Sequence, residues 1–252
     1  MKARTEIEVG LDGRGRTIVT TMRCEAPLLF RIGGSAGDAL LLLMVGGAAG
    51  PIGGDDLQMR VHLGAGTSVI VRSVGATMVQ PGAGGRPSTA DVHITMDQRA
   101  RLDWLPEPLV SVIGSDHRSM TTLELGPACW LRWIDEVSLG RFDEQSGRLA
   151  VRQRLEVEGR VVLDHETQYG TDALRGPGAH GRGRCIASEL IVADDAPTVV
   201  ASLVSPDVVR ATFPLADRAA LTTCIATDRH DPAFRAGSDL SSVQRSSSPQ
   251  VV

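Results

Sequence analysis

Apolar and polar side chains alternate along much of the first two thirds of this chain. In the segment 56–66 (DLQMRVHLGAG), every second residue from Leu57 to Leu63 is apolar, and the residues between them are polar. A period of two predicts a half-buried β-strand, and the Gly-Ala-Gly that follows is typical of a turn. The same pattern, rich in β-branched residues, recurs in the segments 67–79, 90–96 and 149–167.

Strand-sized segments follow one another from about residue 5 to residue 170, separated by turns of glycine, proline and aspartate. This succession predicts a mostly β fold, namely a sandwich, a barrel or a solenoid. A few helices are expected late in the chain. Ser205 could cap a helix over 205–213, with Pro206 at its first position, and 215–226 has an apolar spacing closer to helical. Such helices could form an apolar interface with a partner or cover the β-core.

Length and composition bound the domain organisation. The chain has 252 residues, 42% of them apolar, and can bury a large core, so we expect one β-domain over residues 1–230. Residues 231–252 have little to bury and are expected to be disordered. The formal net charge of -4, with basic and acidic residues interspersed, argues against nucleic acid as a partner.

Several chemistries lack a suitable residue. Lys2 is the only lysine, so a Schiff-base lysine and a phosphate-binding Walker lysine are both excluded. No HExxH motif is present. The N-terminus has no apolar signal core, so we expect a cytoplasmic protein that does not enter a membrane. Reduced thiols rather than a zinc knuckle or a disulfide framework are expected from the widely spaced Cys24, Cys129, Cys185 and Cys224.

A glycine-dense loop, GGAAGPIGGDD (46–56), ends in two adjacent aspartates. Because side chains alternate along a strand, one of Asp55 and Asp56 should point inward and the other outward. An inward aspartate needs hydrogen-bond donors or a cation. Two interpretations remain open for it: an Asx-type turn satisfied by nearby backbone N–H groups, or a functional carboxylate.

The string RLDWLPEPLVSVIGSDH (101–117) contains a rigid bend. The two prolines of Pro106-Glu107-Pro108 fix φ and remove two backbone donors, which holds Glu107 between two strands. Asp116 and His117 follow in the next turn, and a carboxylate beside an imidazole suits a transient nickel or zinc ion. The alternative is a solvated turn, because no second ligand lies at a fixed spacing.

A third string, WIDEVSLGRFDEQSG (133–147), is rich in carboxylates. Asp135 and Glu136 should lie on opposite faces of a short strand, and further carboxylates gather around Arg141. Structural ion pairing explains most of this pattern. The next predicted pair of strands ends near Asp164, His165 and Glu166. Both a structural and a functional interpretation remain open for these residues.

Taken together, the strings GGDDLQMRVHL, LDWLPEPLVSVIGSDH and DEVSLGRFDEQSGRL resemble the urease accessory protein family UreD, called UreH in some systems, in order and spacing over residues 50–170. The resemblance implies a largely β fold whose strands stack in helix-like layers. It also implies a non-enzymatic protein that binds UreF, the GTPase UreG and the urease apoprotein during nickel insertion. No tightly bound cofactor is expected, only nickel in transit.

Acidic turns would suit such a task, because scattered carboxylates and an occasional histidine bind Ni²⁺ weakly enough to release it. Asp55, from the GGD match, and Glu107, from the WLPEP match, are the leading candidates on a nickel route. The chemistry of the side chains alone adds a second group of candidates: Asp116, His117, Glu136 and Glu166.

Two other functions fit the same residues. A β-rich hydrolase of the glycosidase type could use Asp55 and Glu107 as acid and base. Against it, aromatic residues make up only 3% of the chain, which leaves few rings to stack on sugars. A purely structural β-scaffold for another complex needs no functional residue at all.

Overall fold

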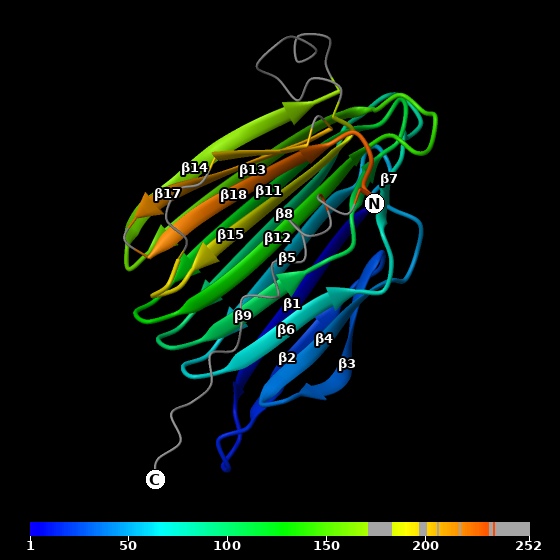
Figure 1. Cartoon of the computed structure of the whole chain (residues 1–252). Coiled ribbons are helices and arrows are strands. Elements are labelled where there is room, and N and C mark those ends of the chain that lie inside the picture. The colour runs from blue at the N-terminus through cyan, green and yellow to red at the C-terminus, as the bar shows by residue number, and fades with distance from the viewer. Residues whose placement is uncertain (171–182, 197–200, 206, 217, 232–233, 235–252) are drawn as a thin grey trace.

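The computed structural model describes residues 1–170, 183–196, 201–205, 207–216, 218–231 and 234 (Figure 1). Nearly all of the predicted tail 231–252 lies outside these residues. In the described part of the chain, eighteen strands form two sheets, here called sheet A and sheet B. Over those same ranges, we find no helix with the length and apolar character needed to cross a membrane.

Sheet A has seven strands in the order β14-β13-β11-β8-β5-β1-β2. Its neighbours from β1 to β13 are parallel, whereas β1–β2 and β13–β14 are antiparallel pairs at the two edges. The strands are β1 (Lys2–Leu11), β2 (Thr17–Cys24), β5 (Asp56–Leu63), β8 (Ser88–Met96), β11 (Asp116–Leu125), β13 (Arg148–Val157) and β14 (Arg160–Tyr169).

Sheet B has the order β16-β17-β18-β15-β12-β9-β6-β4-β3. In addition, the short strand β10 pairs with β12, and β7 pairs with β10. Its central strands β4, β6, β9 and β12 are parallel. The strands are β3 (Leu28–Ala36), β4 (Ala39–Gly46), β6 (Ser68–Ser73), β7 (Thr77–Val79), β9 (Arg101–Leu105), β10 (Leu109–Ser111), β12 (Trp130–Leu139), β15 (Cys185–Val192), β16 (Ala201–Ser205), β17 (Val208–Ala216) and β18 (Ala219–Ala226).

The chain alternates between the two sheets. Strands β4, β6, β9 and β12 of sheet B alternate in sequence with β5, β8, β11 and β13 of sheet A, so each coil adds one parallel strand to each sheet. Parallel neighbours require a crossover connection, and here the strand in the opposite sheet supplies it. Figure 1 shows the strands of both sheets running along the same diagonal. The predicted mostly β, layered and β-helix-like architecture is confirmed.

The inward faces of the two sheets form the main core. In β5, Met59, Val61 and Leu63 are buried, which is the apolar phase that the alternation predicts. Trp133 of β12 stacks on Trp104 of β9, with ring centroids 4.6 Å apart and an interplanar angle of 5°. This stacking joins neighbouring strands of sheet B and adds to the free energy gained by burial.

The prediction of late helices is wrong. Ser205 ends β16 rather than capping a helix, and most of the two predicted helical segments forms the antiparallel strands β17 and β18. Strand β18 is buried on both faces, because its outer side packs in a second apolar cluster with Phe234. Burial on both faces removes the period-two signal, and pairing with β15 supplies the backbone hydrogen bonds that a helix would have made internally.

Close packing at the start of β13 gives a first testable prediction. A Cβ on Gly147 would come within 2.5 Å of the carbonyl oxygen of Val112 and would also clash with Ser115. We therefore expect Gly147→Ala to lower the free energy of unfolding by about 1–3 kcal/mol, since backbone would have to move. Gly13→Ala is the control, because nothing lies within 4 Å of its Cβ position. Equal urea midpoints for the two variants would contradict this packing.

Candidate functional site

The six predicted nickel-route residues do not form one cluster. In the described part of the chain, no three His, Cys, Asp or Glu side chains lie close enough together to hold a metal ion. The six residues instead occupy four places. Asp55 lies at the start of β5 and His117 at the start of β11. Asp116 and Glu166 border a hollow on the outer face of sheet A, and Glu107 and Glu136 share an ion pair near the end of β18. Each place is described in turn.

Asp55 is buried at the end of the glycine-rich loop, and Asp56 beside it is half-exposed, as the alternation predicts. The Asp55 carboxylate accepts a hydrogen bond from the Met1 amine at 2.6 Å and one from the Ile52 N–H at 2.9 Å. Burial raises the pKa of Asp55, but these donors outweigh it and hold the pKa below the ordinary value. The carboxylate is thus satisfied by protein donors, one of them the nearby backbone N–H of Ile52 and the other the distant Met1 amine.

The loop itself is a tight turn. Gly54 has a φ of +94°, a conformation that favours glycine, and its N–H donates to the carbonyl of Pro87. A Cβ on Gly53 would come within 2.6 Å of the backbone of Gly82. Both glycines are therefore needed for the chain to turn closely against the 80–87 loop and present Asp55 at the start of β5.

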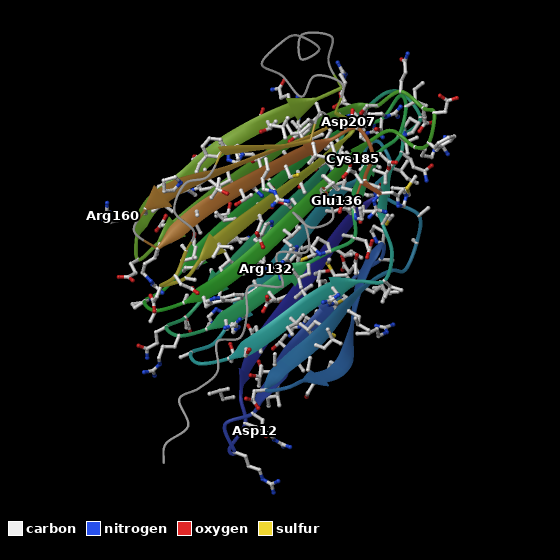
Figure 2. All side chains as sticks on the ribbon, viewed as in Figure 1. Asp12, Arg132, Glu136, Arg160, Cys185 and Asp207 are labelled. Carbon is white, nitrogen blue, oxygen red and sulfur yellow. The ribbon has the colours of Figure 1, made fainter. Side chains whose placement is uncertain are left out.

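Glu107 and Glu136 are brought together by Arg229, which the sequence reasoning did not single out. The guanidinium lies 3.1 Å from Glu136 and 3.9 Å from Glu107. Glu136 is largely buried, whereas Glu107 is exposed and its backbone N–H donates to Ser73 Oγ. Burial first, and then the charge of Glu136, raise the pKa of the neighbouring Cys185 thiol to about 11. Figure 2 labels both Glu136 and Cys185. This thiol therefore stays protonated at neutral pH.

We expect Arg229→Ala to lower the free energy of unfolding by about 1 kcal/mol, because it leaves the largely buried carboxylate of Glu136 without its guanidinium. Arg160→Ala, at an exposed position at the start of β14, should change it by less than about 0.5 kcal/mol. A double-mutant cycle with Glu136→Gln measures the coupling. Additive effects in that cycle would show that the pair contributes nothing.

Asp116 and Glu166 border one hollow on the outer face of sheet A. The hollow has a volume of about 270 Å³ and is also bordered by Arg118 and Arg148. Arg148 donates to Asp116 at 2.6 Å, and Glu166 accepts a hydrogen bond from Gln168 at 2.9 Å. Asp164 next to Glu166 is paired with arginines of β13. Asp116 and Asp164 are therefore ion-paired with arginines, whereas Glu166 is hydrogen-bonded to Gln168.

The loop after β12 contains the ion pair that the sequence predicts around Arg141. Its guanidinium donates to Glu144 at 2.6 and 3.0 Å. These bonds lower the pKa of Glu144 to about 2. The same carboxylate accepts the Arg141 N–H, so the pair closes the turn after β12.

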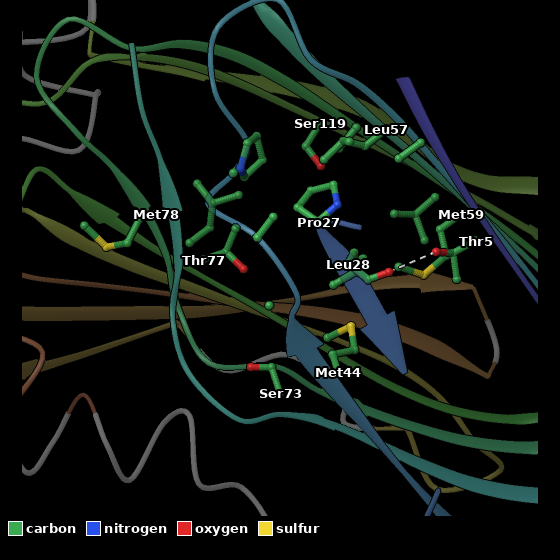
Figure 3. A pocket seen from close by; sticks show the side chains of 18 of the residues that line it. Thr5, Pro27, Leu28, Met44, Leu57, Met59, Ser73, Thr77, Met78 and Ser119 are labelled. Carbon is green, nitrogen blue, oxygen red and sulfur yellow. Dashed lines mark hydrogen bonds between the residues drawn. The ribbon is translucent and has the colours of Figure 1, made fainter. Parts of the chain in front are cut away.

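His117 is buried, with 1% of its surface exposed, and it borders a cavity of about 350 Å³ between the two sheets (Figure 3). Its Nδ1 lies 2.8 Å from the hydroxyl of Ser88, which is itself fully buried. The Nε2 atom is buried and has no hydrogen-bond partner. Burial lowers the pKa of His117 to about 4, so the imidazole is neutral at pH 7. His117 therefore does not sit in a solvated turn.

Asp135 and Gln153 form an interior polar contact that sequence reasoning missed. Asp135 points inward from β12 and accepts hydrogen bonds from Trp133 of the same strand and from Gln153 of sheet A. Burial raises the pKa of Asp135, although these two bonds partly offset it. A signal was present in the sequence, because Asp135 shares the period-two phase of buried Trp133 and Val137. Glu136 lies on the opposite face, as predicted.

Comparison with known proteins decides the family. Residues 2–230 match the model of the family described as UreD urease accessory protein. The chain belongs to the UreD family. A urease accessory protein UreD of Streptomyces coelicolor is 34% identical over 220 residues, which cover 86% of this chain and 87% of that protein. A UreD of Streptomyces avermitilis is 33% identical over 233 residues, covering 90% of this chain and 92% of that one.

A third relative, a urease accessory protein UreD of a Parafrankia strain, is 38% identical over 177 residues, which cover 70% of this chain and 60% of that protein. The match thus spans less than two thirds of the Parafrankia protein. The family match includes the strings on which the resemblance rests and also extends over the β15–β18 region, which carries no motif recognisable from the sequence alone. These UreD proteins are named as accessory proteins of urease.

Proposed function

We propose that this UreD-family chain is a non-enzymatic cytoplasmic scaffold that binds UreF, UreG and the urease apoprotein and helps to deliver nickel to the urease active site. The family match over residues 2–230 carries the proposal. UreG would supply GTP hydrolysis, so this chain needs no nucleotide site of its own. That division of work agrees with a sequence whose only lysine is Lys2.

Polar side chains inside the two-sheet core support a role in moving a cation. Ser88, His117 and Thr121 are buried on neighbouring strands of sheet A, and Gln153 is buried on the next strand. Gln153 donates to Asp135 of sheet B, so the polar groups extend across the gap between the sheets. Buried polar groups cost free energy unless they are satisfied, and an apolar core of this size would do without them. Their presence fits a route for a hydrated ion.

Neither rival function gains comparable support. A glycosidase would need Asp55 and Glu107 to face one substrate. Asp55 is bound by the Met1 amine and Glu107 lies beside Arg229, and neither borders the 350 Å³ cavity. A purely structural scaffold would leave the interior polar side chains without a purpose.

The proposal is tested in a strain that lacks this gene and in the same strain complemented with it. Urease activity in extracts is measured together with the amount of urease subunits on a blot. We expect activity to be lost at an unchanged subunit level and to return with the wild-type gene. Unchanged activity in the deletion strain would refute a role in urease maturation.

A further inference from the structure

Phe142 is a fully exposed aromatic side chain at one end of the fold. It lies in the loop between β12 and β13, and none of its surface is buried. Strands β1, β5, β8, β11 and β13 are parallel, so the loops that precede β5, β8, β11 and β13 gather at one end of sheet A. Figure 1 shows these loops at the end of the sheets where the N-terminus lies. Folding gains no burial energy from this ring, because the ring stays in water.

The turn that carries Phe142 is held rigidly. The N–H of Glu144 donates to the carbonyl of Arg141 at 3.2 Å, so Phe142 and Asp143 are the two central residues of a β-turn. The guanidinium of Arg141 binds the Glu144 carboxylate across the turn at 2.6 and 3.0 Å. Nη2 of Arg184 lies within hydrogen-bond distance of the carbonyl oxygens of Arg141 and Glu144. The backbone beneath the ring is therefore fixed by two arginines.

A second exposed apolar side chain belongs to the neighbouring loop. Ile113, between β10 and β11, has 49% of its surface exposed. Its backbone N–H contributes to the lowered pKa of the Glu144 carboxylate, so the two loops lie against each other. The end of sheet A thus presents a phenyl ring and an aliphatic side chain on adjoining, ordered turns. An apolar group that is already held in place loses little entropy when it binds.

Asp143 supplies the charge beside the ring. The residue is exposed, and its carboxylate has no ion pair or hydrogen bond with any residue that the structure describes. Arg141 is already paired with Glu144. Two copies of this chain that met at Phe142 would therefore bring two unpaired carboxylates together, which disfavours a homodimer. One phenyl ring also supplies only about 150–250 Å², against the roughly 800 Å² per partner that a stable dimer buries.

We propose that Phe142 is the anchor of a docking surface for a different protein, one that presents an apolar pocket with a basic side chain at its rim. The inference rests on the proposed role in a urease-maturation complex. The phenyl ring enters the pocket, Ile113 packs at the edge of the pocket, and Asp143 pairs with the basic group. Anchors that fill a partner's pocket carry much of the binding energy of protein interfaces. The pair of Arg141 and Glu144 positions the ring.

The experiment titrates UreF, UreG and the urease apoprotein separately into the full chain and measures each dissociation constant by calorimetry. We expect Phe142→Ala to weaken the binding of one of them by about 30-fold or more. Glu144→Gln loosens the turn and should weaken the same complex about threefold to tenfold. Phe213→Ala is the matched control, because it removes another exposed phenyl ring, on β17, and it should leave all three affinities unchanged.

The stability of Phe142→Ala separates docking from folding. Because the ring is fully exposed, the urea midpoint of this variant should equal that of the wild type. A marked loss of stability would show that the ring belongs to the core and would overturn the proposal. Self-association of the wild type that Phe142→Ala abolishes would also overturn it, because the occupant would then be a second copy.

The binding data also separate this inference from the proposed function. If Phe142→Ala binds all three proteins as the wild type does, while gene deletion abolishes urease activity, the docking surface is refuted and the proposed function stands. If the wild type binds none of the three, the partner contacts of the proposed function fail, and this inference fails with them.

Discussion

Replacing Trp133 by alanine is expected to lower the free energy of unfolding by about 3–5 kcal/mol. Trp133 has 2% of its surface exposed, stacks on Trp104, and donates its Nε1–H to Asp135 at 2.8 Å. The change leaves a cavity between the sheets and removes one of the two donors to the half-buried carboxylate of Asp135. Urea denaturation followed by circular dichroism measures the loss.

Trp130→Ala, on the same strand, is the matched control. Trp130 is half-buried on the opposite face of β12, where the guanidinium of Arg101 lies 3.5 Å from its ring centroid. Removing this cation–π contact should cost about 1 kcal/mol. If both variants lost the same stability, the inward and outward faces assigned to β12 would be wrong.

The stability of the protein is expected to fall by up to about 3 kcal/mol as the pH is lowered from 6.5 to 4, because of His117. Its pKa is lowered from an ordinary 6.5 to about 4, chiefly by burial. Between these values the unfolded chain takes up a proton at this site and the folded chain does not, so acidification favours unfolding. A difference of about 2.5 in pKa corresponds to roughly 3 kcal/mol.

Comparison of the wild type with His117→Gln isolates this contribution. The pKa of His165 is also lowered by burial, and it adds to the same trend in both proteins. Urea unfolding at several pH values should therefore show a steeper loss of stability in the wild type between pH 6.5 and 4. Parallel curves would contradict a neutral, buried imidazole at position 117.

The alternation of apolar residues predicted the strands well where only one face is buried. Strand β5 follows the predicted phase from Met59 to Leu63, since its outer face meets solvent there. The alternation did not predict strand β18, because Ala220, Thr222 and Cys224 are buried on its second face. A strand buried on both sides has no polar phase, so its short apolar run could not be told from a helix.

The sequence predicted which residues are candidates for the site, but it did not predict which residues they contact in the fold. The sequence identified Glu107 and Glu136 as exceptional, yet Arg229 is 93 positions from Glu136 and reaches it only through the pairing of β18, β15 and β12. Likewise, the interpretation of His117 as part of a turn missed that the first residues of β8 and β11 bury it against Ser88. Long-range pairing of this kind has no local signal.

The most direct test of the nickel-delivery account is the nickel content of urease itself. Urease is purified from the strain lacking this gene and from the complemented strain, and its nickel is measured by mass spectrometry per active site. The account predicts urease that is nearly free of nickel without the gene and fully loaded with it. Fully loaded urease from the deletion strain would contradict the account.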